Sequence, residues 1–277
     1  MRTTRNVWAA TVIALGMVAG GCAGDRTAPA SGPSTTTAAP STAQRIVAPR
    51  ATSFPTAMGT VHLQCRGSGT VPVVLIAGTD DPIQRWDGLV DDLGHGVLTC
   101  RFDADEAAAT GSLTGSVTPG ARADALASAL VASGLPAPYV LVGHSLGGLT
   151  VRQFGADHGA VLGGALLLDP TTPTALASLH PQLTEMGWDA DATQAEADGR
   201  VGWPEVPLVV LSHDPTEAPL GDPVIENLWT QGQEDYGALT GNAVATPVPG
   251  AGHYVDRDAP AQVTRAIDDL VRQAGPS

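Results

Sequence analysis

Short apolar runs alternate with longer helical stretches from Thr60 to the end of the chain. Most of the runs are β-branched and apolar almost throughout, which is typical of strands buried on both faces. Three stretches, at 120–135, 146–159 and 260–275, have a helical pattern. This order predicts an α/β fold with a mostly parallel central sheet flanked by helices. The expected strands are TVHLQC, VPVVLIAG, GVLTCRFD, PYVLVGH, GALLLD, VPLVVLSH and NAVATPVPG.

One of these strands ends in a glycine-rich turn that contains a serine. The letters GHSLG at 143–147 form the pattern G-x-S-x-G, directly after the apolar run 139–142 and directly before a helix. So sharp a turn forces the serine into a strained backbone conformation, and the two glycines keep the neighbouring strand and helix clear of it. The hydroxyl then lies at a helix N-terminus, where negative charge is favoured. The pattern predicts Ser145 as a catalytic nucleophile. The alternative is a tight turn whose serine only caps the helix.

The start of the chain has the layout of an export signal. Arg2 and Arg5 precede an apolar run at 7–18, and small residues follow up to Cys22. The apolar run is shorter than the roughly 20 residues that a membrane-spanning helix needs. The ending VAGGC resembles a bacterial lipobox, in which the cysteine is acylated. We therefore expect a signal peptide at 1–21 and a lipidated Cys22 that anchors an exported protein to the membrane; ordinary secretion is the alternative.

Composition separates a linker from a folded domain and excludes several functions. Residues 22–55 are rich in Ala, Pro, Ser and Thr without an apolar period, which predicts a disordered tether before a single domain at 56–277. The formal net charge of −14 and the lack of any Arg-rich run argue against nucleic-acid binding. The sequence has no H-E-x-x-H, no C-x-x-C and no phosphate loop, so we expect neither a metal nor a cofactor.

The serine motif and two early cysteines, in HLQCRGSGTVPVVLIAG and VLTCRFD, together resemble the α/β-hydrolase superfamily over roughly residues 61–271. The likeness is to esterases and lipase-like hydrolases whose early strands carry paired cysteines. In that fold the strand of Cys65 lies beside the strand of Cys100, so the resemblance implies a disulfide between them. An even pair of cysteines in an exported chain points the same way. The alternative is two buried free thiols.

A serine nucleophile needs a base and an acid. His253, in PVPGAGHYVDRDAP, follows the last strand and precedes the last helix, and it keeps the family's order of nucleophile, acid and histidine. We expect His144, beside the serine, to be structural. Asp169 and Asp214 each follow a strand and are both candidates for the acid, although an aspartate before proline also commonly caps a turn. We favour Asp169, because the region after Asp214 lacks the family's usual GxxD arrangement.

The negative charge that forms when Ser145 attacks a carbonyl group needs two hydrogen-bond donors. The family pattern places them at the backbone N–H of Leu146 and at that of Thr79, in LIAGTDD. The sequence departs from the family at Ala77, which stands where a histidine usually precedes the glycine. A second departure is Ala104, which replaces the arginine of an Asp-Arg-x-Gly turn.

Residues 171–205 are too many for a plain connection and predict a small lid over the sheet's carboxyl edge; a surface excursion without a gating role is the alternative. The sequence as a whole predicts an exported serine hydrolase that cleaves a small-molecule or lipid ester through an acyl-enzyme. Amidase, peptidase, thioesterase or acyltransferase action on the same triad is an alternative within the enzymes. A surface binding protein that has lost its activity is an alternative of another class.

Overall fold

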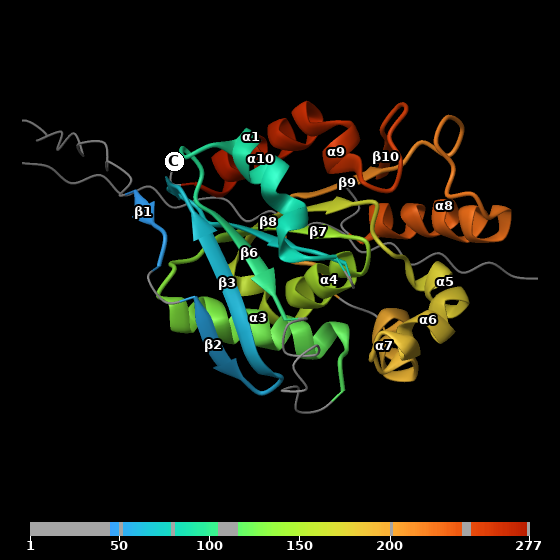
Figure 1. The fold of residues 1–277 in the computed structure, drawn as a ribbon, viewed down its shortest axis with the longest axis horizontal. Coiled ribbons are helices and arrows are strands. Elements are labelled where there is room, and N and C mark those ends of the chain that lie inside the picture. Colours follow the sequence, from blue (N-terminus) through green and yellow to red (C-terminus); the bar gives the residue numbers. More distant parts are fainter. Residues whose placement is uncertain are drawn as a thin grey trace, which may run out of the picture. The chain divides into compact units, whose positions relative to one another are not determined.

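The computed structural model describes residues 45–49, 52–78, 81–104, 116–199, 202–239 and 245–275. Its main feature is an eight-stranded sheet of order β10-β9-β8-β7-β5-β6-β3-β2 (Figure 1). The strands from β10 to β6 are parallel, and β3 and β2 complete the sheet in antiparallel pairing. All seven expected strands are present. The strands of this sheet are β2 (Ser53–Thr56), β3 (Gly59–Arg66), β5 (Val73–Ile76), β6 (Thr99–Asp103), β7 (Tyr139–His144), β8 (Leu162–Leu168), β9 (Leu208–Ser212) and β10 (Ala245–Pro247).

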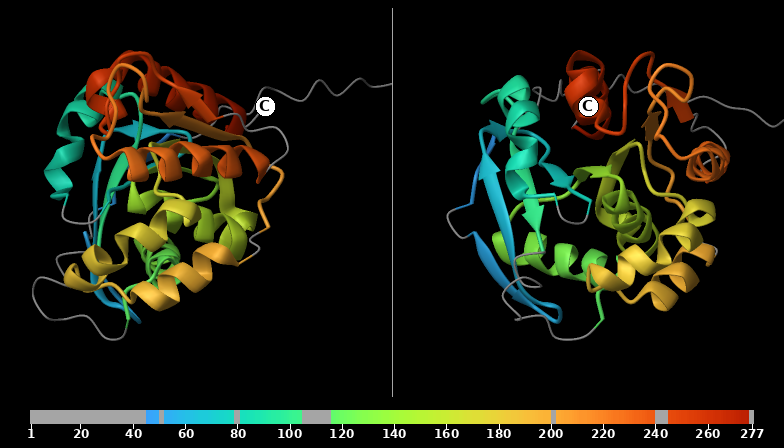
Figure 2. Two further views of the ribbon diagram at one scale, coloured as in Figure 1. Left: turned by 90° about the vertical axis from the view of Figure 1, so that its right-hand side faces the viewer. Right: turned by 45° about the vertical axis from the view of Figure 1, so that its right-hand side comes forward.

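Helices cover both faces of the sheet, as Figure 2 shows. Alternate residues of β7 point to opposite faces: Leu141 packs in the apolar layer that includes Phe154 of α4, and Val140 in the layer that includes Ile267 of α10. The helices are α1 (Asp87–Leu93), α3 (Pro119–Ser133), α4 (Leu146–His158), α5 (Pro173–Leu176), α6 (His180–Glu185), α7 (Ala190–Asp198), α8 (Pro223–Ala238), α9 (Val255–Asp258) and α10 (Pro260–Ala274). The three helices predicted from the sequence correspond to α3, α4 and α10. None of the helices in the described residues is long and apolar enough to cross a membrane.

The central strands are apolar because both of their faces are buried. Every residue of β5 and β7 is buried, which explains their continuous apolar runs. The residues of β3, nearer the edge, alternate in burial instead. Cys65 of β3 lies directly opposite Cys100 of β6 in the antiparallel register, and the two form a disulfide. This confirms the expected pairing.

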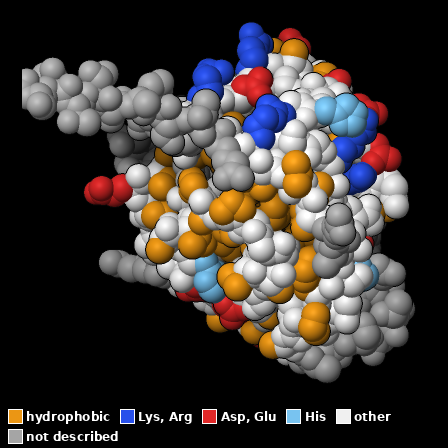
Figure 3. Space-filling view, turned by 90° about the vertical axis from the view of Figure 1, so that its left-hand side faces the viewer, with side chains coloured by type: hydrophobic (Ala, Val, Ile, Leu, Met, Phe, Trp, Pro, Cys, Tyr) orange, Lys and Arg blue, Asp and Glu red, His pale blue; other side chains and the backbone are white. Residues whose placement is uncertain are grey.

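The folded part begins earlier than the expected boundary at residue 56. β1 (Ile46–Val47) pairs with β4 (Ser68–Gly69), and β2 pairs with β3, so the end of the expected tether at 22–55 belongs to the fold. These strands are short, and Pro55 interrupts the apolar pattern at an edge, where proline is tolerated. Figure 3 shows this side of the molecule, with hydrophobic side chains across the middle of the face and basic and acidic side chains along its upper part. The predicted signal peptide, Cys22 and the tether before residue 45 lie outside the described residues.

A helical insertion occupies most of the region that was expected to form a lid. We call residues 171–199, which contain α5, α6 and α7, the cap. The Glu196 carboxylate of the cap accepts hydrogen bonds from the Thr118 hydroxyl and the Gly120 N–H at the start of α3, both at 2.7 Å. Arg152 of α4 donates to the carbonyl oxygens of Ala197, at 2.7 Å, and Gly199, at 3.1 Å. The cap is therefore fastened to two helices that cover the sheet.

Candidate active site

Ser145 occupies the sharp turn between β7 and α4, with φ 52° and ψ −124°. A residue other than glycine at positive φ costs on the order of 1–3 kcal/mol and persists only where the surroundings impose it. Here the Ser145 N–H donates to the carbonyl oxygen of Leu168 at 3.2 Å. The Ser145 carbonyl oxygen accepts from the N–H groups of Gly148, at 2.9 Å, and Thr171, at 3.0 Å. Main-chain bonds to β8 and to the start of the cap thus hold the strained turn.

The glycines on either side of Ser145 are required by space. A Cβ atom on Gly143 would lie 2.8 Å from both the carbonyl oxygen of Gly147 and the Cγ2 atom of Val151. A Cβ atom on Gly147 would overlap the carbonyl oxygen of Ile76 in β5. The G-x-S-x-G pattern therefore reflects a close approach of strand and helix at this turn, for the reason that the sequence suggested.

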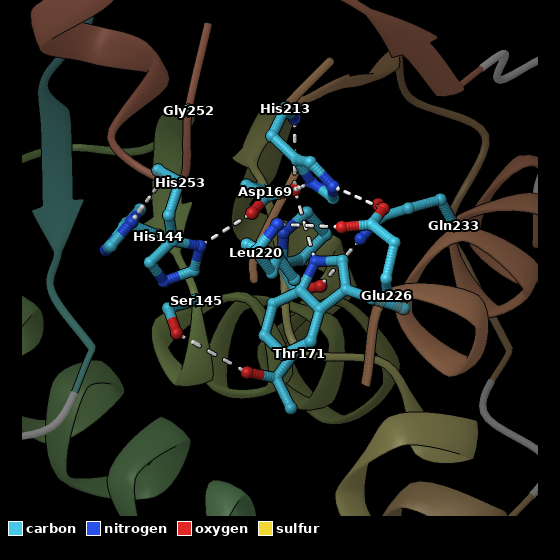
Figure 4. A network of polar contacts seen from close by, with 12 residues as sticks. His144, Ser145, Asp169, Thr171, His213, Leu220, Glu226, Gln233, Gly252 and His253 are labelled. Atoms are coloured by element: carbon cyan, nitrogen blue, oxygen red, sulfur yellow. Dashed lines mark hydrogen bonds and ion pairs between the residues drawn. The ribbon is translucent and has the colours of Figure 1, made fainter. Parts of the chain in front are cut away.

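His253 lies on the loop between β10 and α9, and its ring is turned toward Ser145 (Figure 4). Its Nδ1 atom is 2.6 Å from Oδ2 of Asp169, which follows β8 and is fully buried. Figure 4 shows the His253 ring between the Asp169 carboxylate and the Ser145 side chain. The structure thus brings together three predicted residues that lie far apart in the sequence, at the edge of the sheet where β7, β8 and β10 end.

The Asp169 carboxylate is held in its ionised form. Burial by itself would raise the pKa of Asp169, but hydrogen bonds from His213 and His253 outweigh it and lower that pKa to about 2. Asp169 also adopts a positive φ of 40°, and its N–H donates to the carbonyl oxygen of Leu211 in β9 at 2.7 Å. The backbone that carries this carboxylate is therefore fixed between β8 and β9.

The carboxylate of Asp214, the other candidate acid, accepts hydrogen bonds from loop residues. Its Oδ1 atom accepts hydrogen bonds from the hydroxyl of Thr216, at 2.6 Å, and from two backbone N–H groups, those of Thr216 and Glu217. Its Oδ2 atom accepts from the Gly250 N–H at 3.0 Å. The Thr216 hydroxyl and these N–H groups lower the pKa of Asp214. This is the turn-capping role that the sequence left open, and the geometry favours Asp169 as the partner of His253.

Of the two expected oxyanion donors, Leu146 lies within the described residues and Thr79 does not. Leu146 is the first residue of α4, where backbone N–H groups have no acceptor within the helix. The loop after β5 also passes Ser145, since a Cβ atom on Gly78 would lie 3.2 Å from the Ser145 Cβ atom and 3.6 Å from its Oγ atom. Thr79, the second expected donor, lies outside the described residues, so its role stays a prediction.

Thr171 is a neighbour of the nucleophile that the sequence analysis did not single out. Its Oγ1 atom is 3.5 Å from the Ser145 Oγ atom, and Figure 4 shows the two hydroxyl groups facing each other. Thr171 is fully buried and comes two residues after Asp169. The only sequence signal for it was therefore its position next to a candidate acid at the end of a buried strand.

His144 links the nucleophile's strand to the His253 loop. Its Nε2 atom is 3.0 Å from the carbonyl oxygen of His253, to which it donates. Burial is the main cause that lowers the pKa of His144, which favours a neutral ring. The ring packs against those of His253 and Tyr254, with centroid distances of 4.6 Å and 5.1 Å. The structural role expected for this residue thus includes holding the main chain of the candidate base.

His213 is a second histidine on Asp169, and the sequence analysis passed it over. Its backbone N–H and its Nδ1 atom both lie near Oδ1 of Asp169, at 3.1 Å and 2.8 Å. Its Nε2 atom is 2.8 Å from Oε1 of Glu226 in α8. His213 directly follows β9, the strand next to β8, so its position after a neighbouring parallel strand was an available signal.

One face of α8 covers the segment that carries Asp169. Trp229 donates from Nε1 to Oδ1 of Asp169 at 3.1 Å. Gln233 donates to the carbonyl oxygen of Pro170 at 2.9 Å, and the Tyr236 hydroxyl to that of Thr171 at 2.7 Å. With Glu226, these side chains recur at a spacing of three to four residues, which places them on one side of the helix. The sequence analysis did not predict α8, and so it missed this contact surface.

A cavity of about 350 Å³ lies beside the cap, between α4 and α8. The wall formed by Tyr236 is joined to Thr171 by the hydrogen bond described above. The residues that line it are Arg152, Pro173, Thr174, Ala197, Asp198, Tyr236 and Leu239. Within the described ranges, no group of three or more His, Cys, Asp or Glu side chains is placed to hold a metal ion.

The fold is similar to that of solved esterases and of a protein that cleaves a quinolone ring. An esterase from Thermogutta terrifontis, solved with malate bound, superposes with a TM-score of 0.55 at 19% identity, over 84% of this chain and 100% of its own. RhEst1, an esterase from Rhodococcus sp. ECU1013, gives 0.56 at 17% identity over 81% and 99%. AqDC, which cleaves the ring of the Pseudomonas quinolone signal, gives 0.58 at 15% identity over 81% and 100%. No protein-family model and no curated protein matches the sequence. The chain has the α/β-hydrolase fold, as the sequence predicted.

Proposed function

We propose that this protein is a serine hydrolase that cleaves carboxylic esters through an acyl-enzyme. The observation that carries the proposal is the placement of Ser145: its strained turn faces a histidine whose far nitrogen is bound to a buried, ionised carboxylate. A serine hydroxyl becomes a useful nucleophile when a histidine can take its proton. The residues in these roles are Ser145 as nucleophile, His253 as base and Asp169 as acid.

In the proposed reaction, Oγ of Ser145 attacks the carbonyl carbon of the ester while Nε2 of His253 takes the hydroxyl proton. Asp169 holds the His253 ring by its Nδ1 proton and stabilises the imidazolium ion that forms. The carbonyl oxygen becomes negatively charged and is received by the backbone N–H of Leu146 and, by expectation, that of Thr79. His253 then gives its proton to the departing alkoxide, and water releases the acid from Ser145 by the same steps.

The choice of ester hydrolysis rests on the triad geometry together with the esterases among the structural neighbours. Amidase, peptidase, thioesterase and acyltransferase reactions share the steps up to the acyl-enzyme, so they are alternatives within the same site. For the location, we propose an exported lipoprotein anchored through Cys22, with ordinary secretion as the alternative. The Cys65–Cys100 disulfide supports export, because disulfides persist in oxidising compartments.

The test is hydrolysis of p-nitrophenyl esters from acetate to palmitate by the full chain, beside the variant Ser145→Ala. We expect turnover by the wild type and its loss in the variant, with an acyl-length preference that separates esterase from lipase action. A fluorophosphonate probe should label Ser145 in the wild type, since only an activated serine reacts with it. Absence of both turnover and labelling would sink the proposal and favour a binding protein on a hydrolase scaffold.

A further inference from the structure

The Asp169 carboxylate has more partners than the proposed triad requires. Its Oδ2 atom takes the hydrogen bond of His253, at 2.6 Å. Its Oδ1 atom receives three donors: the backbone N–H and Nδ1 of His213, and Nε1 of Trp229. The orientation of the carboxylate toward His253 is therefore set by the groups on its opposite oxygen.

His213 lies between two carboxylates, and this arrangement determines its charge. The ring is almost fully buried, with Nδ1 and Nε2 each 2.8 Å from a carboxylate oxygen, of Asp169 and Glu226 respectively. An ionised carboxylate only accepts hydrogen bonds, and a neutral imidazole has only one N–H donor. Both contacts can be hydrogen bonds when the ring carries a proton on each nitrogen. Although burial opposes it, hydrogen bonding to Asp169 and Glu226 raises the pKa of His213 to about 9.

Glu226 is itself fixed in place to support the ring. Its Oε2 atom accepts from the Leu220 N–H at 2.7 Å, and its Oε1 atom from the Thr230 hydroxyl at 3.1 Å as well as from His213. The titratable groups that face His213 are Asp169 after β8, Glu226 on α8 and, across Asp169, His253. Asp214, the next residue, turns its carboxylate to Thr216, Glu217 and Gly250. The small cavity beside His213 is otherwise lined by Ser212, Pro215, Thr230, Gln233, Ala245 and Pro247, none of which titrates.

We propose that His213 and Glu226 are positioning residues for the triad: an imidazolium ring held by Glu226 orients the Asp169 carboxylate toward His253 and partly offsets its charge. This inference rests on the proposed function, because it assigns a role relative to His253 as base. The positive charge of the His213 ring lies beside Oδ1 of Asp169 and weakens the attraction of the carboxylate for a proton on the His253 ring. Without the His213 ring, Asp169 would face His253 with a negative charge that no cation at Oδ1 offsets.

The first test compares His213→Asn with the wild type and with His158→Asn, in full-length protein. His158 is the matched control, because its Nε2 atom also pairs with a carboxylate, that of Asp124 at 2.8 Å, but at the far end of α4. We expect His213→Asn to lower kcat by about 10- to 100-fold with KM little changed, as when a group that supports a catalytic residue is lost. The acid limb of its kcat/KM profile should move to higher pH. His158→Asn should leave both unchanged.

The second test reads the charge of His213 without relying on activity. NMR of protein labelled with 15N-histidine should show a His213 ring protonated on both nitrogens at pH 7.5. In Glu226→Gln, which keeps the shape and an acceptor oxygen, the ring should lose its second proton at lower pH, and kcat should fall less than in His213→Asn. Should His213→Asn fail to fold, the two NMR results, on the wild type and on Glu226→Gln, decide whether His213 carries a charge held by Glu226.

The outcomes separate this inference from the proposed function. A neutral His213 ring in the wild type at pH 7.5, or a folded His213→Asn with wild-type kcat and pH profile, would overturn the inference while leaving Ser145 as nucleophile. If the wild type neither hydrolyses esters nor reacts with a fluorophosphonate, the proposed function fails, and the role assigned to His213 fails with it.

Discussion

His144 donates a hydrogen bond from Nε2 to the carbonyl oxygen of His253, 3.0 Å away, and so joins the strand of the nucleophile to the loop of the candidate base. Because the loop reaches the site from the end of β10, its main chain needs such a contact to place the His253 ring. The residue before the nucleophile in the sequence therefore contributes to the placement of a histidine 109 positions away.

We predict that His144→Phe lowers kcat by about 10-fold, because the ring volume is retained but the donor to the His253 loop is lost. His144→Gln should recover part of the loss, since its amide also donates. Steady-state kinetics with p-nitrophenyl acetate measures both, and His95→Gln, at an exposed position, is the control. Equal activity in His144→Phe and the wild type would show that the loop needs no such support.

Asp169→Asn should mainly lower kcat, whereas Asp214→Asn should mainly lower Tm. The loss of the charged partner of His253 should reduce kcat by about 10⁴-fold, as expected when a triad acid becomes an amide. Asp214→Asn should leave kcat within a few-fold of the wild type and lower Tm, because the carboxylate binds the loops at Thr216 and Gly250. Kinetics and thermal unfolding of the two variants decide the assignment, and a reversed pattern would contradict it.

The sequence alone predicted the architecture, because buried parallel strands leave a clear signal. The seven expected strands and the helices α3, α4 and α10 are all present. The strands β1 and β2 were missed because they are short edge segments, and β2 contains a proline. The helix α8 was missed because its inward face at Glu226, Trp229 and Gln233 is polar or mixed, so it lacks an apolar stripe.

The residues of the candidate site could be predicted where their positions follow from the ends of strands and from the order of nucleophile, acid and histidine along the chain. Ser145, His253 and Asp169 each follow a buried strand or precede a helix, so the topology brings them to one edge. The choice between Asp169 and Asp214 depended on side-chain direction, which periodicity does not encode. His213 stood in the same kind of position after β9 as Asp169 after β8, but its function depends on Glu226 in the unpredicted α8.

The thermal stability of the protein should fall at alkaline pH, because His213 loses its proton there. The pKa of His213 in the folded protein, about 9, lies above its ordinary value of 6.5. The protonated ring therefore stabilises the fold fully below about pH 6.5, and this contribution is lost as the pH rises through 9. We predict that Tm of the wild type declines between pH 7 and 10 more steeply than Tm of His213→Asn. Parallel curves for the two proteins in differential scanning fluorimetry would contradict a raised pKa.

The turn at Ser145 should be intolerant of side chains where the structure leaves no space. In Gly147→Ala the new Cβ atom would overlap the carbonyl oxygen of Ile76 and lie 2.7 Å from that of Ala77. We predict a loss of about 1–3 kcal/mol in the free energy of unfolding, together with most of the activity, because β5 or α4 must move.

Gly88→Ala is the matched control for Gly147→Ala. It lies within α1, and a Cβ atom there would meet no atom within 4 Å. This change should be neutral or stabilise the protein by up to about 1 kcal/mol. Urea unfolding of both variants gives the comparison, and a Gly147→Ala protein as stable as the wild type would show that the turn has more room than the structure indicates.

The disulfide should contribute to stability without contributing to catalysis. Cys65 and Cys100 close a loop with a sequence separation of 35, for which the restriction of the unfolded chain is worth about 3–4 kcal/mol. The bond joins β3 to β6, and β5 separates these strands from β7, the strand of the nucleophile. We therefore predict that reductant lowers the urea midpoint of the wild type, while kcat at 25 °C stays the same. A Cys65→Ala/Cys100→Ala protein should start at a lower midpoint and show no response to reductant. If reductant instead abolished activity in protein that was still folded, the β3–β6 edge would have to be coupled to the Ser145 turn through β5.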